Sequence, residues 1–282
     1  MIPQRNLSLL ANRLAKGGGR RIPEAVLDRD YCLAWFLVGL SQEELGQRFV
    51  FKGGTALKRF YFADYRFSED LDFTLTQEAT LVQIQESLKP IFARVRKDSG
   101  IVFQFQREDR NSHQNSYTFY ISYAGPMAAI GAIKEVKVDV TIKEKIAFGI
   151  EELPVLRGYP EYSDLPEDKR LRVYSLNEIA AEKAIALMDR ARNEPRDLYD
   201  IWYLTENNHV DLGEITGEIS QKLEFRGKKL DDVRGELEAK EARLRKLWEN
   251  RLATQMSTLS EFEEVFRSVR RSFRQAGLTK AS

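Results

Sequence analysis

The stretch FVFKGGTALKRFYFADYRFSEDLDFTL, residues 49–75, decides the fold of this 282-residue chain. Its first three residues are apolar and predict a short buried strand. Gly53 and Gly54 follow and indicate a tight turn, because glycine readily adopts backbone conformations that other residues avoid. A short helix is expected over residues 55–62, so the sequence predicts a strand, a glycine turn and a helix in succession.

The end of this stretch alternates strictly between polar and apolar residues. Residues 71, 73 and 75 are apolar and share one face of an expected strand, whereas Asp70, Asp72 and Thr74 share the other. Two neighbouring carboxylates repel each other, and burying them is costly unless a cation neutralises them. Hard oxygen ligands suit Mg²⁺, which often shares its coordination with substrate phosphate and water, and Mn²⁺ is the alternative ion.

The glycine turn is a candidate phosphate site. The amides of Gly54 and Thr55 open the expected helix, where unpaired N–H groups attract an anion. Gly53, Lys58 and Ser68 join them as candidate nucleotide-binding residues. A glycine turn is often only a turn, and an Asp-x-Asp pair is often only a solvated strand face. A phosphate cradle followed by a two-carboxylate strand, in this order, is typical of a nucleotidyltransferase.

A second alternating strand is expected over residues 134–143. Valines and an isoleucine share one face, and Asp139 lies on the other with Lys137. Asp139 thus repeats the arrangement of Asp70 and Asp72, a carboxylate on the polar face of a strand, and is a further candidate site residue. The alternative is a surface ion pair with Lys137 or Lys143, and the sequence does not separate the two.

Two later helices carry further candidates. Ser175 is a plausible cap for a helix in which Lys183 lies within an apolar stripe, so its charge must pair, reach solvent or face a cavity; Glu178 has capping-box spacing. The next helix opens with Glu194-Pro195-Arg196-Asp197 and continues to Asp200. Asp197 could simply favour the helix dipole, whereas Asp200 lies deeper and could reach Lys183 or a nucleotide.

These motifs together resemble the nucleotidyltransferase AbiEii toxin family of the DNA polymerase β-like superfamily. The resemblance covers most of residues 24–205 and rests on Gly53-Gly54-Thr55, on RFSEDLDF (residues 66–73), on AEK (residues 181–183) and on RDxxD (residues 196–200). It implies an α/β (α+β) core with a mixed sheet and a helical C-terminal domain. It also implies catalytic roles for Asp70, Asp72, Lys183 and Asp200, and nucleotide contacts for Arg196 and Asp197. The superfamily takes a third carboxylate from a neighbouring strand, which makes Asp139 the candidate third metal ligand or general base. The superfamily usually has Gly-Ser where this chain has Gly54-Thr55, and threonine keeps the hydroxyl.

The resemblance also implies a function. Such proteins are toxins of type IV toxin–antitoxin and abortive-infection systems, and we expect a magnesium-dependent transfer of a nucleotide from a nucleoside triphosphate to an acceptor. For some members the acceptor is tRNA. No stable complex with the antitoxin is implied. The alternatives are transfer to a small molecule or a protein, and a non-catalytic nucleotide- or partner-binding protein.

Composition is that of an ordinary soluble protein. The net charge is +1, so any nucleic-acid contact must be local, and Arg267, Arg270, Arg271, Arg274 and Lys280 are the candidates near the C-terminus. Basic residues there could equally suit a helix C-terminus. The single cysteine, Cys32, lies in an apolar run and fits a buried thiol in a reducing cytoplasm. No apolar run reaches membrane-spanning length, and there is no signal-peptide pattern.

The expected organisation has four parts. Residues 1–22 form a polar leader, residues 23–150 the nucleotidyltransferase core, residues 151–173 a connection, and residues 174–282 a helical domain that completes the nucleotide site. Within the core, Pro23 begins a helix to about Leu40, and another helix over residues 81–97 is interrupted near Pro90.

Overall fold

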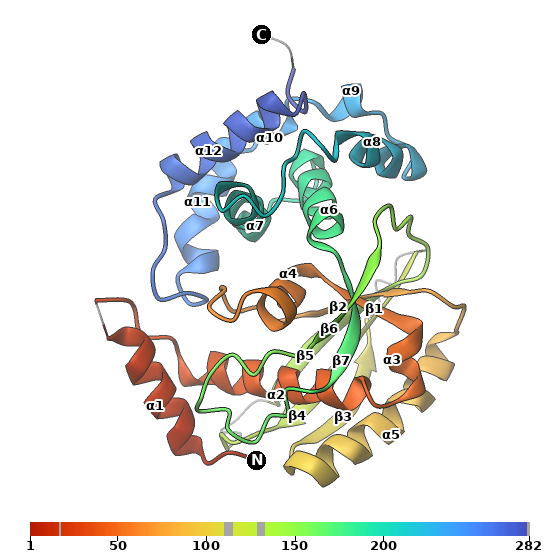
Figure 1. The fold of residues 1–282 in the computed structure, drawn as a ribbon, viewed down its shortest axis with the longest axis vertical. Helices are drawn as coiled ribbons and strands as arrows, with labels where there is room; N and C mark the ends of the chain where they lie inside the picture. Colours follow the sequence, from red (N-terminus) through yellow and green to blue (C-terminus); the bar gives the residue numbers. More distant parts are fainter. Residues whose placement is uncertain (17, 110–114, 129–132, 281–282) are drawn as a thin grey trace. The chain divides into compact units, whose positions relative to one another are not determined.

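The computed structural model describes residues 1–16, 18–109, 115–128 and 133–280. The described chain divides into two compact units, residues 1–144 with 150–173, and residues 145–149 with 174 onward. The first unit contains a mixed sheet with helices, and the second is helical (Figure 1). The predicted α/β core with a helical C-terminal domain is therefore confirmed.

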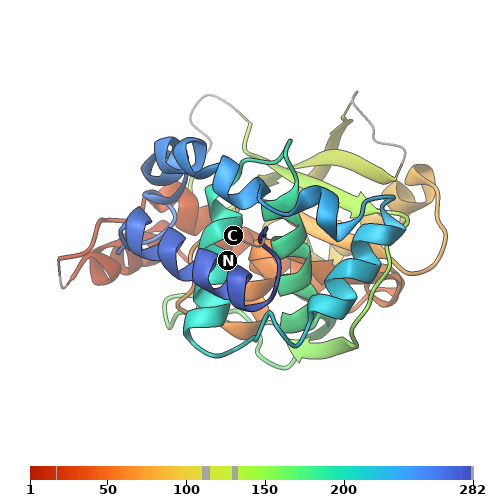
Figure 2. The same cartoon turned by 90° about the horizontal axis from the view of Figure 1, so that it is seen from above.

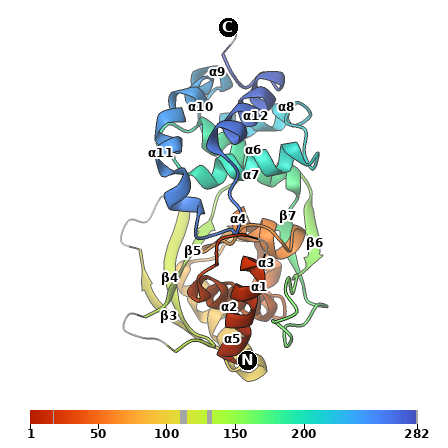
Figure 3. The ribbon, with the colours of Figure 1, turned by 90° about the vertical axis from the view of Figure 1, so that its left-hand side faces the viewer.

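The sheet of the first unit places the two carboxylate-bearing strands side by side. Its strands are β1 (Phe49–Lys52), β2 (Leu71–Leu75), β3 (Val102–Glu108), β4 (Ser116–Ala124), β5 (Glu135–Thr141), β6 (Ile150–Pro154) and β7 (Arg170–Tyr174). Within the described residues they lie in the order β3-β4-β5-β2-β1-β7-β6. Figure 3 shows β3 and β4 towards one edge of the sheet and β6 and β7 at the other. Strand β2 runs antiparallel to β1 and parallel to β5, so β1, β2 and β5 are adjacent at the centre.

One face of these central strands is apolar, as the alternation predicts. Leu71 and Phe73 of β2 are buried, and β5 alternates buried and half-buried residues along its whole length. The Phe73 ring stacks on Phe49 of β1 with ring centroids 4.8 Å apart. Such packing fixes the register, because a one-residue slip would turn every apolar side chain to the polar face.

Helices α2 (Glu24–Leu40), α3 (Glu44–Arg48) and α5 (Leu81–Ser99) complete this unit's core. Phe36 of α2 packs edge-on against Phe103 of β3, with ring centroids 5.6 Å apart. Helix α5 is continuous through Pro90, so the predicted interruption is wrong. Pro90 lies on the exposed side of the helix, where water can hydrogen-bond the backbone carbonyl that proline leaves without an N–H partner.

The N-terminal segment is a helix rather than a polar leader. Helix α1 (Gln4–Ala15) buries Leu7, Leu10 and Ala11. The Arg13 guanidinium donates two hydrogen bonds of 2.7 Å each to the Glu161 carboxylate. Three apolar residues at helical spacing are enough to form a buried stripe within a mostly polar segment.

Residues 151–173 likewise belong to the sheet unit instead of forming only a connection. Strand β6 begins at Ile150 and β7 at Arg170, and Val173 of β7 pairs in parallel with Phe51 of β1. Tyr159 and Tyr162 between these strands are buried. A segment rich in glycine and proline thus contains short strands and two buried tyrosines.

The second unit is helical. Its helices are α6 (Leu176–Met188), α7 (Pro195–Glu206), α8 (Thr216–Phe225), α9 (Leu230–Val233), α10 (Glu236–Ala239), α11 (Glu241–Leu252) and α12 (Phe262–Gln275). Helix α7 packs against α6, α11 and α12, and α6 also packs against α8 and α10 (Figure 2). In the described part of the chain, no helix combines the length and apolar character needed to cross a membrane.

Candidate active site

The glycine turn is built directly against the aspartate strand. A short helix, α4 (Gly53–Ala56), follows β1 and continues as a π-helical turn, η1 (Leu57–Tyr61). Gly53 has φ +79°, and a Cβ atom there would lie 2.5 Å from Oδ2 of Asp72. Only glycine meets both demands, because another residue would be strained in this conformation and would collide with the carboxylate.

A hydrogen bond joins the same turn to the residue before β2. The Thr55 hydroxyl donates to the backbone carbonyl of Asp70 over 2.6 Å, and Thr55 is buried. Ser68 is also buried. The Thr55 hydroxyl thus connects the turn to the Asp70–Asp72 segment.

Register places Asp139 beside Asp72. The parallel pairing of β2 and β5 aligns Asp72 with Asp139 and Leu71 with Val138. Asp70, Asp72 and Asp139 are all half-buried. The polar faces of the two strands therefore carry their carboxylates on adjacent positions of one sheet surface.

The side chain of Asp139 has two donors in its own unit. Thr118 of β4 donates to Oδ1 over 2.5 Å, and Lys137 of β5 donates to Oδ2 over 2.6 Å. The ion pair with Lys137 that the sequence offered as the alternative is therefore present. Asp139 also neighbours Asp72 in register, and its role as a metal ligand or general base stays a prediction.

The carboxylates of this sheet surface suit one magnesium ion that takes only part of its ligands from the protein. In the described residues, no group of three or more histidine, cysteine, aspartate or glutamate side chains is arranged to hold a metal ion. The predicted trio of Asp70, Asp72 and Asp139 is therefore not preassembled. Asp70 and Asp72 alone still fit magnesium, which commonly takes one or two carboxylates and completes its shell with phosphate and water.

Lys58 lies in the interior of the first unit. Its ammonium donates to the carbonyl of Ala63 over 2.8 Å and to the Tyr159 hydroxyl over 2.9 Å, and it lies 4.4 Å from the Phe67 ring centroid. Burial lowers the pKa of Lys58 to about 8. These contacts give Lys58 a packing role that sequence spacing does not reveal, and none of them supports the predicted nucleotide contact.

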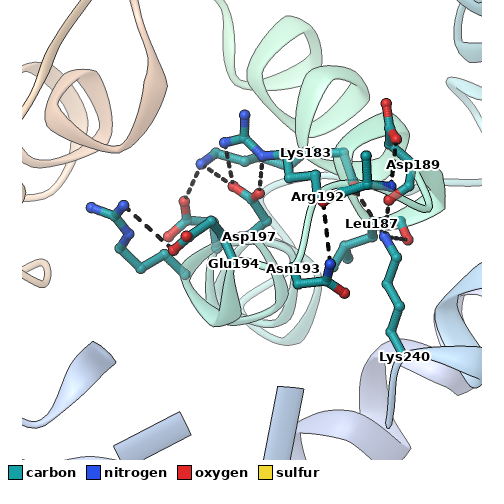
Figure 4. A network of polar contacts seen from close by, with 12 residues as sticks. Lys183, Leu187, Asp189, Arg192, Asn193, Glu194, Asp197 and Lys240 are labelled. Atoms are coloured by element: carbon teal, nitrogen blue, oxygen red, sulfur yellow. Dashed lines mark hydrogen bonds and ion pairs between the residues drawn. The ribbon is translucent and has the colours of Figure 1, made fainter. Parts of the chain in front are cut away.

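In the helical unit, Lys183 pairs with both aspartates of the following helix. Its ammonium donates to Oδ1 of Asp197 over 2.6 Å (Figure 4). The same ammonium lies 2.8 Å from Oδ2 of Asp200. All three side chains are buried. The sequence left open whether Lys183 pairs, reaches solvent or faces a cavity, and in this structure it pairs.

Arg192 is the residue of this cluster that the sequence did not indicate. It lies in the loop before α7 and donates to Oδ2 of Asp197 over 2.6 Å, while its side chain stays 54% exposed (Figure 4). Burial acts to raise the pKa of Asp197, but Lys183 and Arg192 outweigh it and lower that pKa below its ordinary value. Asp197 is therefore held as a carboxylate.

The remaining motif residue, Arg196, lies at the start of α7. Its guanidinium is 3.5 Å from a carboxylate oxygen of Glu194, and it is half-buried. Asp197 lies in the first turn of the same helix, as expected for an acid that favours the dipole. The buried contacts of Asp197 show that this is only part of its role.

Glu178 does not complete the capping box that its spacing suggests. Ser175 does cap α6 by accepting from the Glu178 amide over 3.3 Å. The Glu178 carboxylate instead accepts from the amides of Ala147 and Phe148, over 2.9 and 2.8 Å, and from buried Lys222 over 2.5 Å. This buried pair fixes residues 145–149, which directly follow the Asp139 segment in sequence.

Comparison with known proteins places the chain. A family model described as "Nucleotidyl transferase AbiEii toxin, Type IV TA system" matches residues 35–274. The chain belongs to this family. This AbiEii protein is thus a nucleotidyltransferase toxin, and membership implies a nucleoside triphosphate substrate and a partner antitoxin. A search of curated proteins found no match.

Solved structures share the fold of this AbiEii protein. JHP933 from Helicobacter pylori has a TM-score of 0.54 and 17% identity, covering 91% of this chain and 95% of its own. A putative nucleotidyltransferase from H. pylori has a TM-score of 0.54 and 18% identity, covering 93% of this chain and 100% of its own. MenT4, a nucleotidyltransferase toxin from Mycobacterium tuberculosis, has a TM-score of 0.51 and 19% identity, covering 96% and 99%.

Proposed function

We propose that this AbiEii protein transfers a nucleoside monophosphate from a nucleoside triphosphate to a nucleic-acid acceptor, with tRNA as the first candidate. The observation that carries the proposal is the close approach of the Gly53 backbone to Asp72, which leaves no room for a Cβ atom. It brings the start of a short helix, suited to phosphate, against a carboxylate suited to a phosphate-bound cation.

Asp70 and Asp72 are the proposed ligands of one magnesium ion. Such an ion neutralises charge on the triphosphate and helps to orient it when bound. The backbone of Gly54 and Thr55 is proposed to hold the phosphates. The bond of Thr55 to Asp70 supports this assignment, since it fixes the turn relative to the aspartate segment.

The transfer itself is an in-line substitution at the α-phosphorus. An acceptor hydroxyl forms the new P–O bond, the bond to the β-phosphate oxygen breaks, and pyrophosphate leaves. Asp139 is the candidate acceptor for the hydroxyl proton, since its carboxylate lies in register with Asp72. Positioning and charge, more than covalent chemistry by the protein, supply the rate.

We propose that the helical unit contributes four residues to binding and positioning the nucleotide: Lys183, Arg196, Asp197 and Asp200. The support is a buried cluster in which Lys183 pairs with two aspartates and Arg192 extends to solvent. A lysine and an arginine in such a cluster can donate charge-assisted hydrogen bonds to a phosphate. That the helical domain completes the nucleotide site remains a prediction.

The acceptor is proposed from surface charge. Arg267, Arg270, Arg271 and Arg274 are exposed on α12 and follow the last acid of that helix, although Arg271 lies 3.8 Å from Glu206. Clusters of this kind can contact a phosphate backbone. We also propose a cytoplasmic location and an antitoxin that forms no stable complex with this chain.

A labelled transfer assay tests the proposal. The protein would meet each α-labelled nucleoside triphosphate with Mg²⁺ and total tRNA, beside Asp70→Asn and the surface control Lys89→Met, whose ammonium pairs with Glu86 on α5. We expect label on tRNA with the wild type and the control, and none with Asp70→Asn. Label on protein or on a small molecule would redirect the acceptor. Equal labelling by Asp70→Asn would refute the site.

A further inference from the structure

The polar face of β2 and β5 carries a cation as well as three carboxylates. Lys137 lies two residues before Asp139 and shares its face of β5. The parallel register pairs Leu71 with Val138 and Asp72 with Asp139, so Lys137, Asp72 and Asp139 share one sheet surface. Asp70 directly precedes β2, and these four residues are called the grid below.

Both carboxylate oxygens of Asp139 accept hydrogen bonds from neighbouring side chains. Lys137 donates to one carboxylate oxygen of Asp139 over 2.6 Å, and Thr118 donates to the other over 2.5 Å. A divalent cation would need one of these oxygens to leave its donor. This agrees with the finding that the described residues contain no three acidic, histidine or cysteine side chains grouped for a metal.

A lysine ammonium is ordinarily charged near neutral pH. The charge of Lys137 interacts with Asp139, Asp70 and Asp72, so it acts on all three carboxylates of the grid.

We propose that Lys137 is a built-in cation of the carboxylate face, which holds Asp139 out of metal coordination and leaves Asp70 and Asp72 to bind a single divalent cation. The inference rests on the proposed metal-dependent transfer and refines it. Lys137 is a positioning residue in this account, acting through Asp139. In sites where three carboxylates bind two metal ions, the second ion neutralises the third carboxylate; here the Lys137 ammonium neutralises Asp139 instead.

The plain alternative is an incidental ion pair at the surface. The side chains of Lys137 and Asp139 are 40% and 28% exposed, and such pairs often contribute little to stability. An incidental pair would change the affinity of a metal bound to Asp70 and Asp72 by well under about tenfold, because the screened charge of one lysine would be its only effect. Metal affinity, rather than stability, therefore distinguishes the two accounts.

Mn²⁺ binding to the nucleotide-free full chain provides the test, with free Mn²⁺ measured by electron paramagnetic resonance. Lys137→Met should tighten binding about tenfold or more, because it removes a positive charge near the ion and releases Asp139 as a ligand. Lys137→Arg, which keeps the charge, and the remote control Lys89→Met should bind like the wild type.

The paired variant Lys137→Met with Asp139→Asn decides the role of Asp139. If lysine and aspartate neutralise each other, removing both should leave Mn²⁺ affinity within about twofold of the wild type, because the net charge of the grid is unchanged. A loss of tenfold or more in this double variant would show that Asp139 is a ligand and overturn the inference. An unchanged affinity in Lys137→Met alone would overturn it as well.

Failure of the proposed function would look different. If the wild type and every variant left all Mn²⁺ free, the metal site at Asp70 and Asp72 would be rejected, and the role of Lys137 with it. If the wild type binds Mn²⁺ but the Lys137 variants do not differ from it, only the inference about Lys137 falls.

Discussion

The ammonium of Lys183 lies 2.8 Å from Oδ2 of Asp200 and 2.6 Å from Oδ1 of Asp197, which joins α6 to α7 through a buried ion cluster. Its net effect depends on every member being present. Removing one partner of a buried pair leaves an uncompensated charge away from water. The AEK and RDxxD motifs of the helical unit are therefore both needed to keep this buried cluster neutralised.

Lys183→Met should be strongly destabilising for this reason. We expect the free energy of unfolding to fall by about 3–5 kcal/mol, because two buried aspartates lose their shared cation. Urea unfolding measures this. Combining Lys183→Met with Asp200→Asn should recover part of the loss, since one of the stranded charges is then removed. Strictly additive losses would contradict the cluster.

Arg192→Gln tests the exposed member of the same cluster. Because the Arg192 guanidinium is about half exposed, we expect the free energy of unfolding to change by about 1 kcal/mol or less. We expect kcat/KM for the triphosphate to fall about tenfold, since Asp197 loses its second donor. The exposed neighbour Arg190 provides the control as Arg190→Gln. Equal effects of the two variants would remove the special role of Arg192.

Gly53→Ala should disable the site with a modest loss of stability. The new Cβ would lie 2.5 Å from the Asp72 carboxylate in a backbone conformation of φ +79°. The strain is expected to cost about 1–2 kcal/mol, and displacement of Asp72 should weaken Mn²⁺ binding and transfer together. Gly149→Ala is the matched control, because a Cβ there meets nothing within 4 Å. Normal Mn²⁺ binding by Gly53→Ala would contradict this geometry.

The buried ammonium of Lys58 predicts a pH dependence of stability. Its pKa is about 8 in the folded chain and ordinarily 10.5. Between these values the unfolded chain keeps a proton that the folded chain has lost, so this residue makes stability rise with pH across that window. Relative to Lys58→Met, the wild type should gain up to about 3 kcal/mol over the window. Lys240, which has a similar pKa, is present in both proteins. A pH-independent difference would show that Lys58 keeps an ordinary pKa.

Alternation and glycine chemistry made the centre of the fold predictable. The strict pattern at residues 70–75 and again at 134–143 assigns each aspartate to the polar face of a strand. The structure confirms this for Asp72 in β2 and Asp139 in β5, whereas Asp70 directly precedes β2. Nothing in either pattern specifies that β2 and β5 are neighbours. That pairing, and with it the register of Asp72 and Asp139, comes from tertiary packing.

Residues outside periodic segments were harder to predict. Arg192 lies in a loop with no repeat, and its bond to Asp197 depends on how the loop folds back on α7. Glu178 has capping-box spacing, yet its carboxylate binds Lys222 and a distant pair of amides, because a buried cation offers a stronger partner than one amide. Residue spacing along the chain predicts hydrogen-bond partners within the same helix but not partners that tertiary packing brings close.

Pyrophosphate release measured against acceptor labelling tests the central claim most directly. With one triphosphate, Mg²⁺ and tRNA, the wild type and Gly149→Ala should release one pyrophosphate for each nucleotide added to the acceptor, and Asp72→Asn should do neither. That result would establish nucleotidyl transfer at the strand that Gly53 contacts. Release of inorganic phosphate without nucleotide addition, or equal transfer by Asp72→Asn, would contradict the account.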